Sequence, residues 1–314
     1  MNATAKPAIL VTAADLAPQA LALLGDFDIV FAGRTPDEDA IASLCAKHQP
    51  VAIIVRYGKI PARVMDASAR LRVISKHGSG TDTIDKVAAA QRGIEVKAAA
   101  GANADAVAEH SWALILACAK GVVTLDGRMR AGFWDKATHK SFELKGKTLG
   151  VVGLGAIGRR VAQIGLAFGM RVVGHDPFVT EAPAGVAAAT LDELFAASHV
   201  VSLNCPLTDE NRQMVNRTSI AKMRDGAILV NTGRGGLVDE QALLEALASG
   251  KLRAAGLDAY STEPLVGEHP FRAVPNVVLS PHVGGVSEDA YVNMGTAAAR
   301  NVLDALSGAP RQAA

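Results

Sequence analysis

An arginine, a glutamate and a histidine in the second half of this 314-residue sequence are the residues best suited to acid–base chemistry on an anion. Arg234 lies in the segment NTGRGG, Glu263 in GLDAYSTEP and His282 in SPHVGG. A guanidinium forms paired hydrogen bonds with a carboxylate or a keto oxygen, and a histidine can give or take a proton near neutral pH. Glu263, if it pairs with His282, would stabilise the imidazolium and raise its pKa. Taken singly, the three residues could equally be a helix cap, an exposed turn and a core histidine.

A glycine-rich segment, VVGLGAIGR, ends a β-branched run and opens an Ala/Leu-rich helix that we expect to continue to residue 168. Gly153 permits a tight turn, Gly155 lets a pyrophosphate approach the backbone, and Gly158 lets the helix pack closely on the strand. The first residues of the helix, Ala156 and Ile157, offer unpaired N–H groups and a partial positive charge to phosphates. The pattern predicts a dinucleotide site.

An acidic residue, Asp176, ends the following strand, 18 residues beyond Gly158. There its carboxylate can accept hydrogen bonds from the hydroxyls of the adenosine ribose. Because a carboxylate would repel a 2′-phosphate, we expect NAD rather than NADP as the cofactor.

The composition indicates a globular chain without a broad surface for nucleic acid or membrane. Hydrophobic residues make up 49% and charged residues 20%, and the formal net charge is +1. No stretch approaches the roughly 20 apolar residues that cross a bilayer, and the first residues lack the pattern of a signal peptide. Cys45, Cys118 and Cys205 lie far apart without CxxC spacing, so we expect neither a disulfide framework nor a metal site. A cytoplasmic protein with a small-molecule partner is the resulting expectation.

The elements that must position these residues alternate between short β-branched runs and helical stretches, which predicts parallel sheets covered by helices on both faces. We expect two doubly wound domains with a boundary near residue 100, a long helix over 104–131, and a final helix from about 286. In such folds ligands bind at the carboxyl ends of the strands. The expected strands are 8–11, 28–31, 51–55, 73–75, 94–96, 148–152, 171–173, 200–203, 227–230 and 277–280, and other expected helices are 15–24, 37–48 and 83–92.

The order of the motifs over nearly the whole chain resembles the D-isomer-specific 2-hydroxyacid dehydrogenase family. The motifs are HGSGTDTID (77–85), GANADAVAEH (101–110), the glycine-rich turn, CPLTDENR (205–212), NTGRGGLVDEQAL (231–243), GLDAYSTEP (256–264) and SPHVGG (280–285). The resemblance implies a Rossmann NAD-binding domain over 101–285 and a flavodoxin-like substrate, or lid, domain over 1–100 that the C-terminal helix 286–314 completes. It also implies closure of the cleft before hydride transfer, and a homodimer to which 104–131 contributes.

The same resemblance implies roles for individual residues. Arg234 is similar to the substrate-binding arginine of the family, Glu263 to its histidine-tuning acid, and His282 to its general acid/base. Asp258 resembles the residue that orients the nicotinamide carboxamide. The remaining residues implied to contact substrate or cofactor are Gly78, Ser79 and Gly80 for the substrate carboxylate, Asn103 at the hinge, Thr232 and Gly233 beside the nicotinamide, and Cys205 and Pro206 at the adenine.

The substrate is the least defined part of the prediction. Arg56, Lys59 and Lys76 could favour a substrate with a second anionic group, although most charges of this region are expected on a solvated face. Relatives that handle phosphoglycerate tend to have a small hydroxyl residue where this chain has Tyr57. We therefore expect hydride transfer between NAD(H) and C2 of a small D-2-hydroxy acid or 2-keto acid such as glyoxylate or hydroxypyruvate.

Two other functions are compatible with parts of this pattern. An NAD(H)-sensing binding protein of the C-terminal-binding-protein corepressor type would keep similar residues and would bind NAD without turnover. A formate dehydrogenase would resemble a branch with a glutamine beside the histidine, and Glu263 argues against it.

Overall fold

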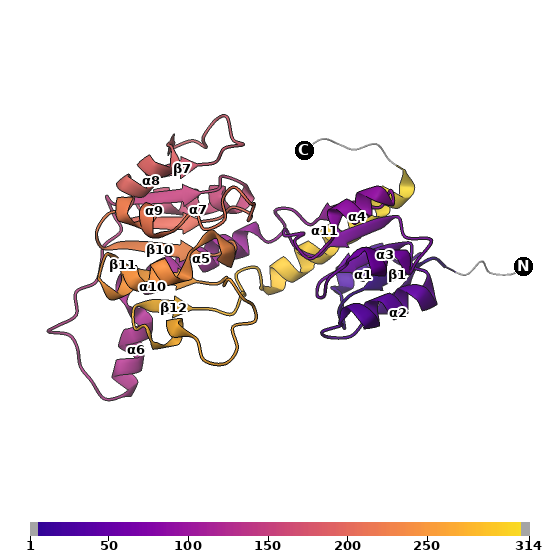
Figure 1. Cartoon of the computed structure of the whole chain (residues 1–314), viewed down its shortest axis with the longest axis horizontal. Helices are drawn as coiled ribbons and strands as arrows, with labels where there is room; N and C mark the ends of the chain where they lie inside the picture. Colours follow the sequence, from indigo (N-terminus) through magenta and orange to yellow (C-terminus); the bar gives the residue numbers. More distant parts are fainter. Residues whose placement is uncertain (1–5, 309–314) are drawn as a thin grey trace, which may run out of the picture. The chain divides into compact units, whose positions relative to one another are not determined.

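Two parallel sheets with helices on both faces form the chain, as a computed structural model of it shows for residues 6–308 (Figure 1). One unit contains the residues up to Asn103 together with those from Val286 onward, and the other contains Ala104–Gly285. The predicted α/β class with two doubly wound parallel sheets is confirmed.

The sheet of the first unit has the strand order β2-β1-β3-β4-β5, the flavodoxin-like order predicted for it. Neighbouring strands in this order are all parallel. The strands are β1 (Ala8–Val11), β2 (Asp28–Phe31), β3 (Ala52–Val55), β4 (Val73–Lys76) and β5 (Glu95–Ala98).

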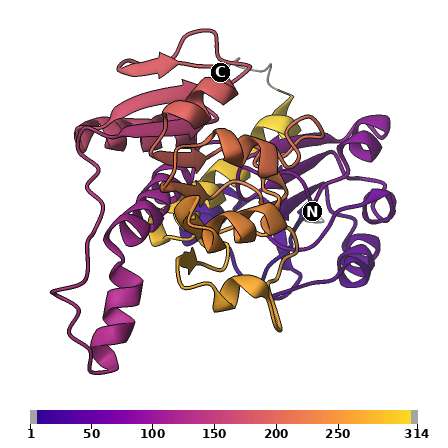
Figure 2. The same cartoon turned by 60° about the vertical axis from the view of Figure 1, so that its left-hand side comes forward.

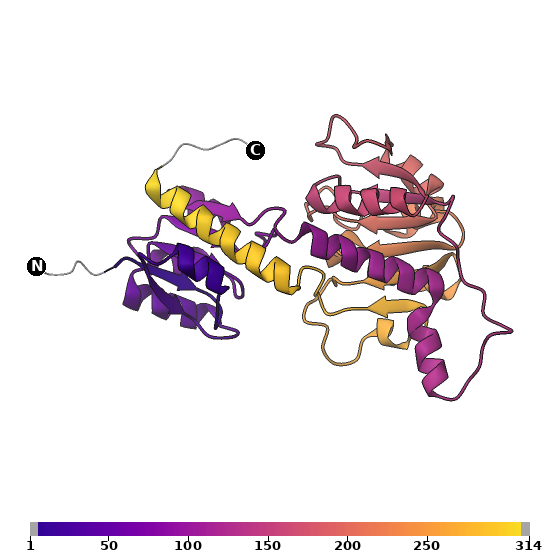
Figure 3. The same ribbon diagram turned by 180° about the vertical axis from the view of Figure 1, so that it is seen from behind.

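Helices cover both faces of this sheet. On one face, α1 (Pro18–Leu23) packs against α11 (Glu288–Ser307), which also contacts β3, β4 and β5 (Figure 3). On the other face lie α2 (Glu38–His48), α3 (Ala62–Asp66) and α4 (Lys86–Gln91). The short α3 is a helix that the sequence pattern did not predict. Of the expected C-terminal helix, residues 309–314 lie outside the described part of the chain.

The sheet of the second unit has the order β12-β11-β10-β9-β6-β7-β8. Read from β8, this is the Rossmann order extended by one strand. Two of its strands, β8 and β11, were not predicted. The strands are β6 (Thr148–Val152), β7 (Arg171–His175), β8 (Val186–Ala188), β9 (Val200–Leu203), β10 (Ala227–Asn231), β11 (Leu252–Leu257) and β12 (Val277–Leu279).

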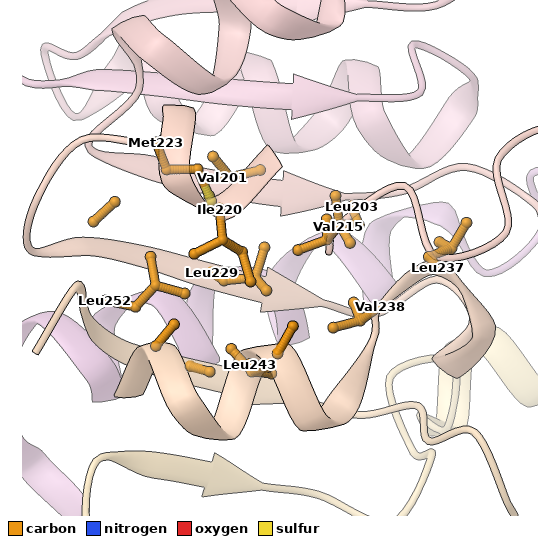
Figure 4. Packing of buried hydrophobic residues seen from close by; sticks show 14 of the residues in the cluster. Val201, Leu203, Val215, Ile220, Met223, Leu229, Leu237, Val238, Leu243 and Leu252 are labelled. Atoms are coloured by element: carbon orange, nitrogen blue, oxygen red, sulfur yellow. The ribbon is translucent and has the colours of Figure 1, made fainter. Parts of the chain in front are cut away.

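Two helix layers enclose this sheet. On one face α5 (Ala104–Lys120) and α7 (Ala156–Ala167) lie side by side (Figure 3). On the other face α8 (Leu191–Ala197), α9 (Arg217–Lys222) and α10 (Glu240–Ala248) pack on the sheet through the aliphatic cluster drawn in Figure 4. Short 3-10 turns, Gly235–Leu237 and Pro270–Ala273, follow β10 and precede β12.

The strand β11 was missed because its residues are small rather than β-branched. It is buried apart from Arg253, and a Cβ on Gly256 would come within 2.8 Å of the Leu114 Cβ on α5. The close approach of this helix therefore requires a residue without a side chain in the strand, which hides the β-branched signal of an interior strand.

The predicted single helix over 104–131 is wrong. Gly121 adopts a left-handed conformation (φ 67°), ends α5, and begins α6 (Val122–Arg130) at an angle of 61°. A Cβ at Gly121 would lie 3.1 Å from the His139 ring, so both space and backbone favour glycine there. Figure 2 shows α6 and the segment after it extending away from the sheet of the second unit. Among the described residues, no single helix is long and apolar enough to span a membrane.

Candidate active site

The glycine-rich turn connects β6 to α7, where the sequence placed it. Gly153 has a positive φ of 89°, and a Cβ on Gly158 would come 1.8 Å from the Gly153 carbonyl oxygen. Packing therefore demands both glycines. A Cβ on Gly155 would meet no protein atom within 4 Å, so nothing in the fold requires a glycine there. The bare backbone at this position suits a ligand that approaches the start of α7, as a pyrophosphate does in dinucleotide-binding folds.

The carboxylate of Asp176 lies directly against this turn. Its Oδ2 accepts a hydrogen bond from the Leu154 N–H (2.8 Å), and its Oδ1 accepts one from the Phe178 N–H (2.9 Å). Each carboxylate oxygen can accept a second hydrogen bond, so both keep capacity for a hydroxyl donor. The arrangement fits the ribose of NAD and disfavours an added phosphate.

The segment after β9 packs against the glycine-rich turn. A Cβ on Gly153 would lie 2.9 Å from the Cys205 backbone nitrogen, so this segment packs directly on the turn, and Pro206 follows it. Burial raises the pKa of the Cys205 thiol to about 11, which keeps the sulfur neutral. Cys205 therefore contributes an apolar surface rather than a nucleophile.

His282 and Glu263 form a hydrogen-bonded pair. The His282 Nδ1 lies 2.7 Å from the Glu263 Oε2, and the Glu263 Oε1 accepts a hydrogen bond from the Tyr260 N–H (2.9 Å). The hydrogen bond and the charge of Glu263 raise the pKa of His282 against the opposing effect of burial. Burial alone would raise the pKa of Glu263, but the bonds from His282 and Tyr260 outweigh it and lower that pKa. The pair therefore favours an imidazolium beside a carboxylate.

Arg234 follows β10 on a loop that the Asn231 side chain holds. The Asn231 Nδ2 donates to the Arg234 carbonyl oxygen (2.9 Å), and its Oδ1 accepts from the Gly233 N–H (3.0 Å). A Cβ on Gly235 would overlap the backbone of Tyr260, so this loop packs tightly on the loop that carries Glu263. The charge of Arg234 lowers the pKa of both His282 and Glu263. The structure thus brings together the three residues that the sequence singled out.

Asp258, which is 2% exposed, holds the loop that carries His282. Its Oδ1 accepts hydrogen bonds from the Ser280 Oγ (2.6 Å) and the Val283 N–H (2.9 Å), and its Oδ2 accepts one from the Gly284 N–H (2.8 Å). His282 lies between these anchors with a positive φ of 55°, a strained conformation for a residue other than glycine. The buried carboxylate fixes that conformation from both sides.

Sequence reasoning missed several residues of this network. The His110 Nε2 on α5 lies 2.8 Å from the Ser280 Oγ and 3.4 Å from the Asp258 Oδ1. The Tyr260 hydroxyl donates to the backbone carbonyls of Leu257 and Ser280. Their only sequence signal is their presence inside the motifs AEH, DAY and SPH.

Thr232, predicted beside the nicotinamide, is tied to α5. The Ser111 hydroxyl donates to the Val107 carbonyl oxygen (2.8 Å) and lies 2.8 Å from the Thr232 Oγ1. Because Ser111 has only one hydroxyl hydrogen, Thr232 must be the donor in the second contact.

In the first unit, the predicted substrate residues Gly78, Ser79 and Gly80 follow β4. Gly78 has a φ of 142°, and the Ser79 hydroxyl donates to the Asn103 Oδ1 (3.0 Å). This unit therefore brings the predicted loop and the predicted hinge residue together.

Among residues 6–308, no group of three or more histidine, cysteine, aspartate or glutamate side chains gathers in a way that could hold a metal ion.

The fold and the glycine-rich turn define a dinucleotide-binding protein, and comparisons with known proteins specify its family. Residues 112–284 match the model of the D-isomer specific 2-hydroxyacid dehydrogenase, NAD binding domain. The chain is 43% identical over 239 residues to a hydroxypyruvate reductase of Thermotoga maritima, covering 76% of this chain and 78% of the relative. It is 36% identical over 312 residues to a glyoxylate reductase of Aeropyrum pernix, covering 95% and 92%. The crystal structure of the TT0316 protein from Thermus thermophilus superposes with a TM-score of 0.88 at 38% identity, covering 96% and 97%.

The chain belongs to the D-isomer-specific 2-hydroxyacid dehydrogenase family. The predictions of an enzyme and of NAD as its cofactor are confirmed at this level. The chain spans 57% of the length of the mycobacterial D-3-phosphoglycerate dehydrogenases that it also matches.

Proposed function

We propose that this protein transfers a hydride between NAD(H) and C2 of a small 2-keto or D-2-hydroxy acid, with hydroxypyruvate and glyoxylate as the first candidates. In this proposal His282 is the general acid/base, Glu263 tunes it, and Arg234 binds the substrate. The observation that carries the proposal is the 2.7 Å bond between His282 and Glu263 within the electrostatic reach of Arg234. The names of the two relatives supply the candidate substrates.

The chemistry divides between cofactor and protein. Bound NADH supplies the hydride that reduces C2. Arg234 binds the carboxylate and keto oxygen of the substrate and stabilises the negative charge that develops on that oxygen. Glu263 accepts a hydrogen bond from the His282 Nδ1–H, so the imidazolium gives the proton on its Nε2 to the alkoxide oxygen. In the reverse direction the neutral imidazole takes the proton back.

The second unit is proposed to hold the cofactor. The turn from Gly153 to Gly158 would bind the pyrophosphate, Asp176 the ribose hydroxyls, and Cys205 with Pro206 the adenine. Thr232, Gly233, Arg234, Asp258 and His282 would surround the nicotinamide. The start of α7, where the N-cap residue Gly155 makes no side-chain cap hydrogen bond, and the spare acceptor capacity of Asp176 support this assignment.

The first unit is proposed to be the substrate domain. Gly78, Ser79 and Gly80 would receive the substrate carboxylate through their backbone amides, with Asn103 beside them. The positive φ of Gly78 and the bond between Ser79 and Asn103 support this role.

The test is turnover of NADH with a panel of glyoxylate, hydroxypyruvate and pyruvate. We expect turnover by the purified protein, and a His282→Ala variant should lose about 10²- to 10⁴-fold in kcat while its NADH dissociation constant changes little. His48→Ala, at the end of α2, is the matched control. Binding of NADH without turnover of any member of a broader keto-acid panel would refute the enzyme and favour the corepressor-like sensor.

We also propose a homodimer formed through α6 and the segment that follows it. No residue of α6 is buried, and the apolar side chains of Val122, Val123, Met129, Phe133 and Trp134 are 52% to 75% exposed. Exposed apolar side chains gathered along one segment mark a protein interface, and a second copy of the chain is the occupant proposed here.

The dimer is tested by light scattering after size exclusion. We expect a dimer for the wild-type protein and a monomer for Phe133→Asp. Phe178→Asp, at a residue 90% exposed elsewhere in the second unit, should stay dimeric. A monomeric wild-type protein, or an unchanged Phe133→Asp variant, would contradict the proposal.

A reducing compartment such as the cytoplasm is the location we propose. Cys45, Cys118 and Cys205 are unpaired, and burial raises the pKa of the first two thiols to about 12. Location of a tagged protein by fractionation tests this expectation.

A further inference from the structure

Five residues of the first unit form a charged cluster, called the Arg56 cluster here: Asp15, Arg56, Tyr57, Lys76 and Tyr291. The Arg56 guanidinium is hydrogen-bonded to the Asp15 carboxylate, and its Nη1 also donates to the Asp15 carbonyl oxygen (3.1 Å). Its Cζ lies 4.8 Å from the centre of the Tyr291 ring and 5.4 Å from that of Tyr57. The Tyr291 hydroxyl donates to the Asp15 Oδ1 (2.7 Å), so the aspartate binds the arginine and one of its flanking rings.

The cluster lies at the position where doubly wound folds bind ligands. In the strand order β2-β1-β3-β4-β5, the order reverses between β1 and β3, and ligands bind beyond the carboxyl ends of those strands. Arg56 is the first residue after β3, and Asp15 lies on the loop after β1. The Thr12 hydroxyl joins the two loops: it donates to the Tyr57 carbonyl oxygen (2.6 Å) and accepts from the Arg56 N–H (3.0 Å). These two bonds fix the backbone of Arg56 and Tyr57 against the end of β1, on the loop that carries Asp15.

Within the cluster, Lys76 contacts the backbone of Arg56 rather than the Asp15 carboxylate. This residue, the last of β4, donates from its Nζ to the Arg56 carbonyl oxygen (3.0 Å). Burial, with the charges of Arg56 and Lys76, lowers the pKa of the adjacent His77 to about 4, so this histidine adds no charge at neutral pH.

Exposure decides which member of the ion pair a ligand meets. The Arg56 side chain is 17% exposed, whereas that of Asp15 is 68% exposed. A second anionic group on a substrate would therefore approach the Asp15 carboxylate, while the rings of Tyr57 and Tyr291 flank the guanidinium. The Asp15 carboxylate would repel that anionic group, and the Arg56 guanidinium, which could attract it, is already bonded to Asp15.

We propose that Asp15 is a specificity-determining residue that restricts the substrate to small keto acids with one carboxylate. It does so because it neutralises the charge of Arg56 beyond the carboxyl ends of β1 and β3. This inference rests on the proposed keto-acid reductase function and specifies its substrate class. A keto acid that carries a phosphate or a second carboxylate on C3 is excluded by the charge of Asp15, although Arg56 at the end of β3 could otherwise bind that group.

The experiment compares kcat/KM for hydroxypyruvate and phosphohydroxypyruvate, with NADH, in the wild-type protein and in Asp15→Asn. The asparagine keeps the shape of the side chain and removes its charge. We expect the phosphorylated-to-unphosphorylated ratio of kcat/KM to rise about three- to tenfold, mainly through KM, and the gain to shrink as salt is added. Asp39→Asn is the matched control, because Asp39 pairs with Arg63 (2.6 Å) on the surface of the same unit, and its ratio should not change.

A double variant tests whether Asp15 acts through Arg56. In Asp15→Asn/Arg56→Gln the gain should disappear, and Arg56→Gln alone should lower the ratio below that of the wild-type protein. If Asp15→Asn fails to fold, the single Arg56→Gln variant still decides, because an unchanged ratio overturns the proposal. A wild-type preference for the phosphorylated acid, or an equal rise in Asp39→Asn, also overturns it. If the wild-type protein reduces neither acid nor any other keto acid, the proposed function itself has failed.

Discussion

Replacing Glu263 by glutamine tests whether the carboxylate controls the proton of His282. The variant keeps the side-chain length and a hydrogen-bond acceptor but removes the charge that raises the pKa of His282. Because that pKa is raised, the imidazolium, which is the form that donates a proton, persists to higher pH in the wild-type protein. As the pH is raised, kcat/KM for keto-acid reduction should therefore begin to decline at a lower pH in Glu263→Gln than in the wild-type protein.

The magnitude follows from the contact. A hydrogen bond between charged groups contributes about 1.5 to 3 kcal/mol, against about 1 kcal/mol for a neutral one. The His282 and Glu263 side chains are 46% and 34% exposed, so solvent screens their charges and only the lower end of the range applies. A difference of about 0.5 kcal/mol predicts a loss of roughly twofold in kcat/KM on the alkaline side.

The assay is the initial rate of hydroxypyruvate reduction across the pH range, with NADH held saturating. Glu240→Gln is the matched control, because Glu240 binds the Ser261 N–H (2.8 Å) on the same loop without touching His282. Its alkaline limb should overlay that of the wild-type protein. An alkaline limb in Glu263→Gln that coincides with the wild-type curve would refute the tuning role.

Three further predictions concern the turn, the histidine loop and the first unit. Gly155→Ala should keep the wild-type Tm and bind NADH at least tenfold more weakly, whereas Gly158→Ala should lower the Tm as well; thermal melts and fluorescence titration distinguish them. Ser280→Ala, which removes a donor to the buried aspartate after β11, should lower kcat about tenfold at constant NADH affinity, and threonine should restore it; a uniform loss of Tm with unchanged kcat would contradict this. Burial holds His77 neutral with a pKa of about 4, so the unfolded state binds more protons than the folded state between pH 6.5 and 4. The free energy of unfolding should therefore decrease as the pH is lowered from 6.5 to 4. Melts of His77→Gln should show a weaker dependence there, and His48→Gln should not.

The sequence predicted those features whose signals are local. The turn from Gly153 to Gly158 was placed correctly because a β-branched run, three glycines and a helix follow one another in the chain. The pairing of Glu263 with His282 was expected from the family resemblance alone, because the strand before Glu263 was not predicted. In the structure both residues lie on loops after neighbouring parallel strands, β11 and β12. Parallel strands that are adjacent in a sheet bring their carboxyl ends to one edge.

The features that the sequence missed depend on contacts between distant segments. The break at Gly121 and the small residues of β11 depend on what packs against them, which a propensity pattern does not contain. The bond between Tyr291 and Asp15 joins residues 276 positions apart, and that between His110 and Ser280 joins residues 170 apart. Such polar networks become visible only once the topology is known.

The first unit is assembled from both ends of the chain, and this affects the order in which the protein can mature on the ribosome. Strands β1, β3 and β4 are synthesised early, but α11, whose Ala298, Ala299 and Val302 pack against Ile9, Val11 and Ile54, is synthesised last. Until that helix arrives, one aliphatic face of the first sheet is covered only in part, by α1, whereas residues 104–285 form an uninterrupted segment that can fold on emergence. A nascent chain stalled before residue 286 should therefore depend on chaperones for its N-terminal part, not for the middle segment.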